Sequence, residues 1–214
     1  MLWSILIPMI PERYHSAQPL LFNLLETQGV SRMSEVELLV LMDNRRRTVG
    51  EKRNALVAAA RGEYISQIDD DDEVASQYVD TIYKTIARTR RSDNPADVIC
   101  FPQRATIAPH GLIHECEYSL KHWKDREPAQ RRQLLQIIGT DGKPRQDALA
   151  WSGPPAHTMV WRSGIAKAVK FPEKRFGEDV DWVDKCCELA VNEVQIKGEP
   201  LYYYKFDPGG SATR

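Results

Sequence analysis

Four consecutive aspartates, Asp69, Asp70, Asp71 and Asp72, are the residues whose type and spacing point most directly to chemistry. They follow residues 64–68, YISQI, which are expected to form a strand, so their carboxylates are expected at the end of a buried strand. Adjacent carboxylates repel one another, whereas Mg²⁺ and Mn²⁺ prefer carboxylate oxygens and commonly bridge them to phosphates. The cluster therefore predicts a metal–phosphate site, with a solvated acidic turn that caps the next helix as the alternative.

Short apolar strands alternate with helices along the first half of the chain and would position this cluster. Strands are expected at residues 3–10, 36–42, 64–68 and 98–101, and helices at residues 18–28, 48–60 and 75–90. This alternation predicts an α/β fold, in which helices cover both faces of a parallel sheet. Ligands of such sheets bind beyond the carboxyl ends of the strands. Asp43, which follows the second strand, should therefore share one crevice with the aspartate cluster.

The second half of the chain has a less regular pattern. We expect a hairpin at residues 104–118, a short helix at 128–138, a Gly/Pro-rich loop at 139–155, a helix that begins near Asp179, and two short strands within 194–206. A chain of 214 residues is long enough for one domain with a sizeable core. We expect residues 1–103 to form a nucleotide-binding half and residues 104–214 an acceptor-binding and catalytic half.

The charge of the whole chain excludes one class of partner but leaves another open. A net charge of −1 indicates that the molecule as a whole is not an electrostatic nucleic-acid binder. Basic runs at residues 45–47, 88–91 and 131–132 nevertheless leave room for a polyanionic partner near the acidic site.

The cysteines and apolar runs predict where the protein resides. The four cysteines show neither a disulfide framework nor zinc-ligand spacing, which favours buried, reduced thiols in a cytoplasmic protein. No apolar run approaches the ~20 residues that span a bilayer. Residues 1–10 lack the basic start of a signal peptide and are expected to form the first strand.

Two common phosphate-binding motifs are absent from the sequence. No GxGxxG follows the first strand, and GxxxxGK[ST] occurs nowhere in the chain. Phosphates would therefore be held by a metal ion and by side chains.

Five ordered segments resemble those of family 2 glycosyltransferases with the GT-A fold. They are SILIP at 4–8, ELLVLMD at 37–43, GEKRN at 50–54 with ARGEYI at 60–65, IDDDD at 68–72, and FPE at 171–173 with GEDVDW at 177–182. The resemblance covers nearly the whole chain. It implies the Rossmann-like GT-A sheet, mixed but mainly parallel, and transfer of a sugar from a nucleotide-diphosphate donor.

The resemblance also implies roles on the donor side. Asp43 would bind the nucleotide base, and Pro8 would frame the base pocket through backbone contacts. Asp71 is the expected metal ligand, while Asp69 and Asp70 would hold ribose hydroxyls or metal-bound water. Mn²⁺ or Mg²⁺ would neutralise the diphosphate leaving group of the donor, most often a UDP-sugar in this family. Positive charge near the phosphates is expected from Arg13, Lys52 and Arg53.

Asp179 is the expected general base of the same resemblance. It would take the proton of the acceptor hydroxyl while that oxygen attacks the anomeric carbon, which inverts the configuration; the alternative is an ordinary helix cap. Asp207 stands where the family often has a histidine that ligates the metal. His157 would line the acceptor side or approach the metal, unless it is a buried histidine with satisfied hydrogen bonds. The other expected acceptor-side residues are Trp151, Glu178 and Trp182.

Alternatives to this function are a nucleotidyltransferase and a non-catalytic module that binds sugar nucleotides. Residues 9–13 lack the Gly-rich loop of the first, and the expected base and ligands argue against the second. The acceptor is open between a glycan, a protein, a small molecule and a hydroxymethylated DNA base. For DNA, the three basic runs would grip phosphates if they lie on one face, and Trp151 would stack on a flipped base. Donor sugar and oligomeric state are also open.

Overall fold

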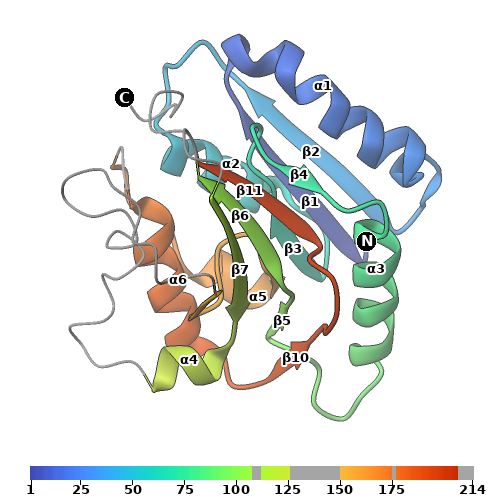
Figure 1. Cartoon of the computed structure of the whole chain (residues 1–214), viewed down its shortest axis with the longest axis vertical. Helices are drawn as coiled ribbons and strands as arrows, with labels where there is room; N and C mark the ends of the chain where they lie inside the picture. The colour runs from blue at the N-terminus through green and yellow to red at the C-terminus, as the bar shows by residue number, and fades with distance from the viewer. Residues whose placement is uncertain (108–111, 126–149, 175–176, 207–214) are drawn as a thin grey trace.

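The computed structural model describes residues 1–107, 112–125, 150–174 and 177–206. These residues form two β-sheets with helices packed around them, as Figure 1 shows. The predicted α/β fold with a mixed, mainly parallel sheet is thereby confirmed.

The larger sheet has six strands in the order β10-β5-β9-β3-β1-β2. Its strands are β1 (Trp3–Met9), β2 (Val36–Met42), β3 (Tyr64–Gln67), β5 (Val98–Cys100), β9 (Val160–Arg162) and β10 (Glu193–Gln195). Every residue of β1 is buried, and Leu6 lies opposite both Leu39 of β2 and Gln67 of β3 in parallel ladders. The carboxyl ends of these three strands therefore meet at one edge of the sheet, as the alternation of strands and helices predicts.

One strand of this sheet runs against the others. β9 lies between β3 and β5 and pairs antiparallel with both. Its amino end therefore lies at the edge where β3 and β5 end. For this reason His157, which precedes β9, reaches the same edge as the aspartate cluster.

The smaller sheet has five strands in the order β4-β11-β6-β7-β8. They are β4 (Glu73–Val74), β6 (Gln103–Ile107), β7 (Leu112–Tyr118), β8 (Ala150–Gly153) and β11 (Tyr202–Phe206). Antiparallel pairing of β6 with β7 confirms the predicted hairpin. The two predicted final strands are also present as β10 and β11, but they belong to different sheets. Because β4 directly follows the aspartates and pairs with β11, the cluster lies where the two sheets meet.

Most of the predicted helices are present, with shifted bounds. They are α1 (Tyr14–Phe22), which continues as a π-helical turn (Asn23–Thr27), α2 (Val49–Ala59), α3 (Tyr78–Thr89) and α6 (Glu178–Leu189). α1 begins earlier than the expected residue 18, and α6 begins next to Asp179 as predicted. The short helices α4 (Leu120–Lys124) and α5 (Ser163–Ala168) were not expected. The helix predicted at 128–138 lies outside the described residues.

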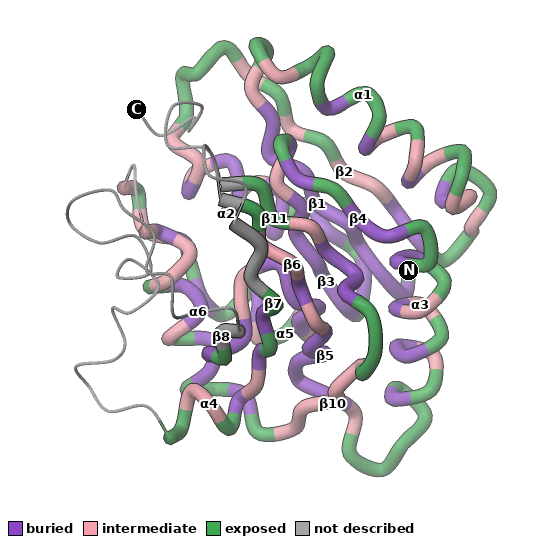
Figure 2. The backbone as a smooth tube through the Cα atoms, viewed as in Figure 1, coloured by how far each residue is buried: buried purple, intermediate pink, exposed green. Residues whose placement is uncertain are grey.

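Buried side chains form one hydrophobic cluster that includes residues from both halves of the chain. Figure 2 shows the buried residues concentrated in the sheets and on the inner sides of the helices. On α3 the buried Tyr78, Ile82 and Ile86 recur at helical spacing, which is why this segment forms an amphipathic helix. None of the helices in the described ranges is long and apolar enough to cross a membrane.

Candidate active site

The aspartate cluster forms the turn between β3 and β4, and its four carboxylates have different environments. Asp70 is buried: its Oδ1 accepts from Arg13 Nη1 at 2.8 Å and its Oδ2 from the Ile10 N–H at 3.0 Å. Asp70 therefore ties the loop after β1 to the turn after β3. Both of its oxygens are hydrogen-bonded within the protein, so the predicted ribose or metal-water contact would have to share them.

Asp69 lies between two cations. Its Oδ1 is 2.7 Å from Arg53 Nη2 and its Oδ2 is 3.3 Å from His157 Nε2. Its backbone N–H donates to the hydroxyl of Tyr202 at 3.1 Å. Burial favours the protonated acid, but the charges of Arg53 and His157 outweigh it and hold the pKa of Asp69 well below its usual value.

Asp72 is buried and serves as a structural link to the second sheet. The Tyr202 hydroxyl donates to its Oδ2 at 2.6 Å, and the Lys205 N–H donates to its Oδ1 at 2.8 Å. Burial, together with the charge of Asp69, raises the pKa of Asp72 well above its usual value. Asp72 therefore fastens β11 to the aspartate turn.

Asp71 is the most exposed member of the cluster, with a side chain that is 40% exposed. Arg13 Nη1 lies 3.0 Å from its Oδ2. Partial desolvation and the charge of Asp69 nevertheless raise the pKa of Asp71 to about 6. The neighbouring cations therefore do not fully neutralise the carboxylates of the cluster. The remaining negative charge lies at Asp71, the residue predicted to bind a metal ion.

Helix α2 places Lys52 between the end of β1 and the residue that follows β2. Lys52 Nζ donates to the Met9 carbonyl at 2.9 Å and lies 2.8 Å from Asp43 Oδ1. The Asp43 carboxylate also accepts from the backbone N–H groups of Arg45 and Arg47. Asp43 lies at the predicted edge of the sheet, but it holds its own loop in place. Recognition of a base through Asp43 remains a prediction.

Arg53 of α2 is the centre of a buried ion network. Its Nη1 donates to Gln67 Oε1 at 2.8 Å, its Nη2 to Asp69 at 2.7 Å, and its Nε lies 3.4 Å from Glu178 Oε1. The guanidinium carbon lies 5.8 Å from the centre of the Phe171 ring. The side chain is 4% exposed. Arg53 therefore connects the turn after β3 with the first residue of α6.

Close contact between α2 and residues 171–172 explains how this network is held. A Cβ on Gly50 would lie 2.4 Å from the Pro172 carbonyl oxygen, so only glycine allows this approach. Asn54 Nδ2 donates to the Phe171 carbonyl and its Oδ1 accepts from the Phe171 N–H, both at 2.9 Å. The segment that leads to α6 is thus fixed against α2.

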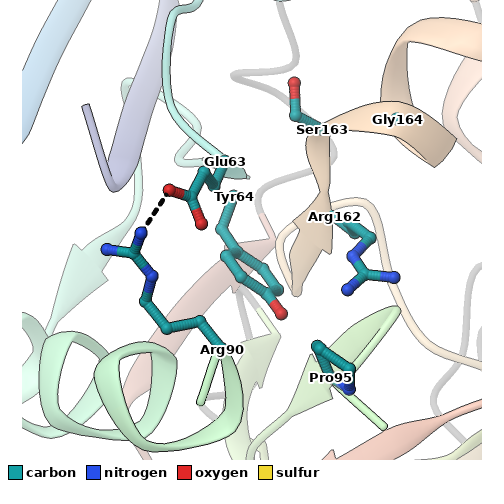
Figure 3. Close-up of a pocket in the computed structure, with 7 residues that line it drawn as sticks. All are labelled: Glu63, Tyr64, Arg90, Pro95, Arg162, Ser163 and Gly164. Atoms are coloured by element: carbon teal, nitrogen blue, oxygen red, sulfur yellow. Dashed lines mark hydrogen bonds and ion pairs between the residues drawn. The ribbon is translucent and has the colours of Figure 1, made fainter. Parts of the chain in front are cut away.

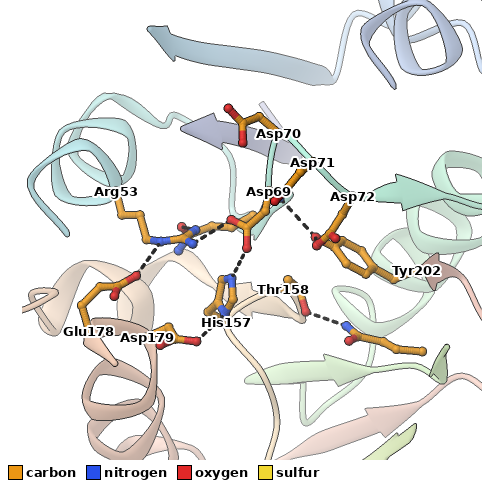
Figure 4. Close-up of polar contacts among 12 residues, drawn as sticks. Arg53, Asp69, Asp70, Asp71, Asp72, His157, Thr158, Glu178, Asp179 and Tyr202 are labelled. Atoms are coloured by element: carbon orange, nitrogen blue, oxygen red, sulfur yellow. Dashed lines mark hydrogen bonds and ion pairs between the residues drawn. The ribbon is translucent and has the colours of Figure 1, made fainter. Parts of the chain in front are cut away.

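The candidate base, Asp179, faces the aspartate cluster across His157, as Figure 4 shows. His157 Nδ1 is 3.3 Å from Asp179 Oδ2, while its Nε2 is 3.3 Å from Asp69 Oδ2. Burial and Arg53 lower the basicity of the imidazole, but the two carboxylates prevail and raise the pKa of His157 to about 9. Burial would raise the pKa of Asp179, yet the hydrogen bond and charge of His157 lower it. Asp179 is thus ionised at neutral pH, and its side chain is 35% exposed.

Burial limits what three of the predicted site residues can contact. Trp182 was expected on the acceptor side, but it is buried, stacked on Phe171 at 4.6 Å between ring centres and 5.5 Å from the ring of Trp161. Lys52 and Arg53 were expected near phosphates, but both are buried with carboxylate partners. Trp182 belongs to the core, and the two cations hold the site together from behind.

The other predicted residues divide between described and undescribed parts of the chain. Glu178 is buried beside Arg53, and burial raises its pKa although Arg53 opposes this. Pro8 is buried within β1, opposite Leu41. Asp207 and the side chain of Trp151 lie outside the described residues.

Two members of the site, Tyr202 and Gln67, were not predicted from the sequence. Tyr202 could be found only from the pairing of β4 with β11, which brings it beside Asp72. Gln67 is separated from the first aspartate of the cluster by one residue, Ile68. Its side-chain Nε2 is buried and has no hydrogen-bond partner in the described part of the chain. Such an orphaned donor marks a place where a water or ligand would be accommodated.

The two basic runs that the structure describes lie at opposite edges of the six-stranded sheet. Residues 45–47 follow the carboxyl end of β2. Residues 88–91 end α3, where Arg90 pairs with Glu63 and Glu35, which precede β3 and β2 at the amino edge of the sheet. The third run lies outside the described residues. The two described runs therefore do not meet the geometric condition for gripping DNA.

A metal ion would have to share its ligands with a substrate. Among the described residues, no group of three or more His, Cys, Asp or Glu side chains is arranged to hold a metal ion. Mg²⁺, however, commonly takes one or two carboxylates together with substrate phosphates. The exposed Asp71 with its raised pKa suits such a site, so the donor set fits an ion bound together with a diphosphate.

Two cavities in the described structure lie away from this cluster. One, of about 290 Å³, is lined by residues that include Glu63, Arg90 and Arg162 at the amino edge of the sheet, and Figure 3 shows it. The other, of about 430 Å³, lies between β2 and α2 and is mainly apolar. Neither contains a predicted site residue, so the candidate site rests on the side-chain network.

Comparisons with known proteins show the fold. No protein-family model matches the chain, and no curated protein matches it in sequence. The structure is similar to that of S. aureus TarS 1–349 in complex with UDP-GlcNAc, with a TM-score of 0.65 and 16% identity over 100% of this chain and 60% of that chain. For TarS 1–349 in complex with UDP, the TM-score is 0.62 and the identity 17% over 97% of this chain and 61% of that chain. The chain thus spans about 60% of TarS 1–349 and has its GT-A-like fold.

Proposed function

We propose that the protein transfers a sugar from a nucleoside-diphosphate donor, with UDP as the nucleotide, to a hydroxyl acceptor with inversion of configuration. The observation that carries this proposal is Asp179, an ionised and partly exposed carboxylate that His157 holds opposite the aspartate cluster. The likeness of fold to TarS, which was crystallised with UDP-GlcNAc and with UDP, supports this choice of donor.

On the donor side, Asp71 is the residue that would hold a divalent cation together with the diphosphate. When bound, the cation would supply Lewis-acid stabilisation of the departing diphosphate. Arg13 lies beside Asp71 and is partly exposed, so it adds a second positive charge on the same side. Asp70 keeps Arg13 in this position by accepting from the same Nη1.

On the acceptor side, Asp179 takes the proton of the attacking hydroxyl. The hydroxyl oxygen forms its bond to the anomeric carbon while the bond from that carbon to the diphosphate oxygen breaks. The electron pair of the broken bond leaves with UDP, and the proton remains on Asp179. One displacement of this kind inverts the configuration without a covalent sugar–enzyme intermediate.

Calorimetric titration of UDP and UDP-GlcNAc, with Mn²⁺ and then with EDTA, tests the donor side. We expect affinity that depends on Mn²⁺ and that is lost in Asp71→Ala. Undiminished affinity of Asp71→Ala in Mn²⁺ would rule out the ligand role. Absence of binding to either nucleotide by the folded wild-type protein would contradict a UDP-sugar donor.

Release of UDP from the donor, with water as the simplest acceptor, tests the base. General base catalysis contributes about 10²- to 10⁴-fold, so Asp179→Asn should lower kcat by that factor while its UDP affinity stays within about twofold. Asp181→Asn is the matched control, because Asp181 lies in the same first turn of α6 but is exposed and paired with Lys174. A wild-type rate in Asp179→Asn would exclude the base role.

A further inference from the structure

A single imidazole connects the donor side of the candidate site to the candidate base. Asp69 belongs to the turn after β3, whereas Asp179 belongs to the first turn of α6. His157 contacts both carboxylates, one through each ring nitrogen, and its side chain is 12% exposed. The two carboxylates would otherwise repel one another across this gap.

Asp179 depends on His157 for its orientation. Within the described ranges, the ion pair with His157 Nδ1 is the one that fixes its carboxylate. Arg53 pairs with the neighbouring Glu178 and thereby fixes the start of α6, whereas it acts on Asp179 through its charge and not through a hydrogen bond. The His157 contact uses Asp179 Oδ2, which leaves Oδ1 for an acceptor hydroxyl.

The backbone that carries His157 is itself fixed. The Thr158 hydroxyl accepts from Gln103 Nε2 of β6 at 2.5 Å, and the N–H of the buried Met159 donates to the Ala156 carbonyl at 3.1 Å. Because residues on both sides of His157 are anchored, the backbone that carries the imidazole has a set position. The carboxylate of Asp179 is thus held by a ring whose own backbone is fixed.

We propose that His157 is a positioning residue that bridges Asp69 and Asp179, so that one imidazolium sets the base relative to the aspartate turn, which Arg53 also holds through Asp69. This inference rests on the proposed function. Only the doubly protonated ring can donate to both carboxylates at once, since a neutral ring directs one lone pair at an oxygen. The charged groups that face the ring are Arg53 from α2, Asp69 from the turn after β3, and Asp179 and Glu178 from α6.

The first experiment measures UDP affinity and UDP release from UDP-GlcNAc in Mn²⁺ for the full chain, for His157→Gln and for His122→Gln. His122 lies on α4, away from the network, and serves as the matched control. Misplacement of a catalytic group by about 1 Å can lower the rate about 100-fold. We therefore expect kcat of His157→Gln to fall about 100-fold while UDP affinity changes less than about threefold. A purely structural role would instead lower affinity, rate and melting temperature together.

A second variant separates positioning from general damage to the fold. His157→Gly should regain activity when imidazole is added, and the rescue should weaken as the pH rises above the pKa of free imidazole, because the bridge requires the cation. Restored activity that does not depend on pH would overturn the bridging role, and so would a wild-type kcat in His157→Gln. If the folded wild-type protein neither binds UDP nor releases it from the donor, the proposed function itself fails, which is a distinct result.

Discussion

Ion pairs at the two ends of the six-stranded sheet are built from the same residue types but differ in burial. At the carboxyl end, Arg53 is 4% exposed and contacts Asp69 and Glu178. At the amino end, Arg90 pairs with Glu63, and its side chain is 38% exposed. The charged groups at the carboxyl end have lost most of their contact with water and contact one another, whereas those at the amino end remain largely hydrated.

This difference determines what each set can do. Exposed pairs contribute about 0–1 kcal/mol and adapt easily, so they specify little geometry. A buried network must be complete, because removing one member leaves its partner charged and without water. The carboxyl end thus fixes the relative positions of the aspartate turn, His157 and α6, which a catalytic site requires.

Removing the central cation of the buried network should have the largest effect. Arg53→Met keeps much of the aliphatic volume but leaves Glu178 uncompensated and Asp69 with His157 as its remaining cation. We expect the free energy of unfolding to fall by about 3–5 kcal/mol, as measured by urea denaturation. The physical reason is that Glu178 is buried and cannot regain its hydration in the folded state.

Arg162→Met is the matched control at the other end of the sheet. Arg162 pairs with Asp97 at 3.3 Å, but its side chain is 39% exposed. Its loss should change the free energy of unfolding by less than about 1 kcal/mol. Equal effects of the two substitutions would remove the distinction drawn between the two ends.

A smaller effect of opposite sign is expected at Asp71. Its pKa of about 6 in the folded protein lies above the ordinary value of 3.8, so the folded state binds this proton more tightly than the unfolded chain does. The ionised carboxylate therefore destabilises the fold above pH 6, and this penalty disappears as the pH falls toward 4. In EDTA, Asp71→Asn should be more stable than wild type at pH 7.5, by less than about 1 kcal/mol because the group is exposed.

Thermal unfolding at several pH values checks this prediction. The stabilisation by Asp71→Asn should shrink between pH 6 and pH 4, where the wild-type carboxyl becomes protonated. Asp80→Asn is a suitable control, since Asp80 is an exposed partner of Lys84 on α3. A variant that is less stable than wild type at pH 7.5 would show that Asp71 is satisfied by Arg13, and the excess negative charge would not exist.

Patterns along the chain could predict the elements but not the partners of each side chain. Alternating periods predicted the strands that end before Asp43 and Asp69, because local propensity and burial act over a few residues. The antiparallel direction of β9 could not be predicted from a strand of three residues, so the place of His157 between Asp69 and Asp179 was not predicted. Likewise, GEKRN was recognised as a motif, but whether Arg53 faces solvent or the interior depends on packing against residues 171–172.

The smallest effect is expected for Arg90→Gln at the amino end. Arg90 Nη2 lies 2.7 Å from Glu63, but its Nη1 is 3.9 Å from Glu35, and all three side chains are well exposed. Water replaces the lost contacts, so the free energy of unfolding should change by no more than about 0.5 kcal/mol. Urea denaturation at low and high salt would measure it, and the small difference from wild type should vanish at 1 M salt, where the Debye length is about 3 Å. A salt-independent loss above about 1 kcal/mol would mean that the cavity lined by Arg90 is as tightly organised as the carboxyl end.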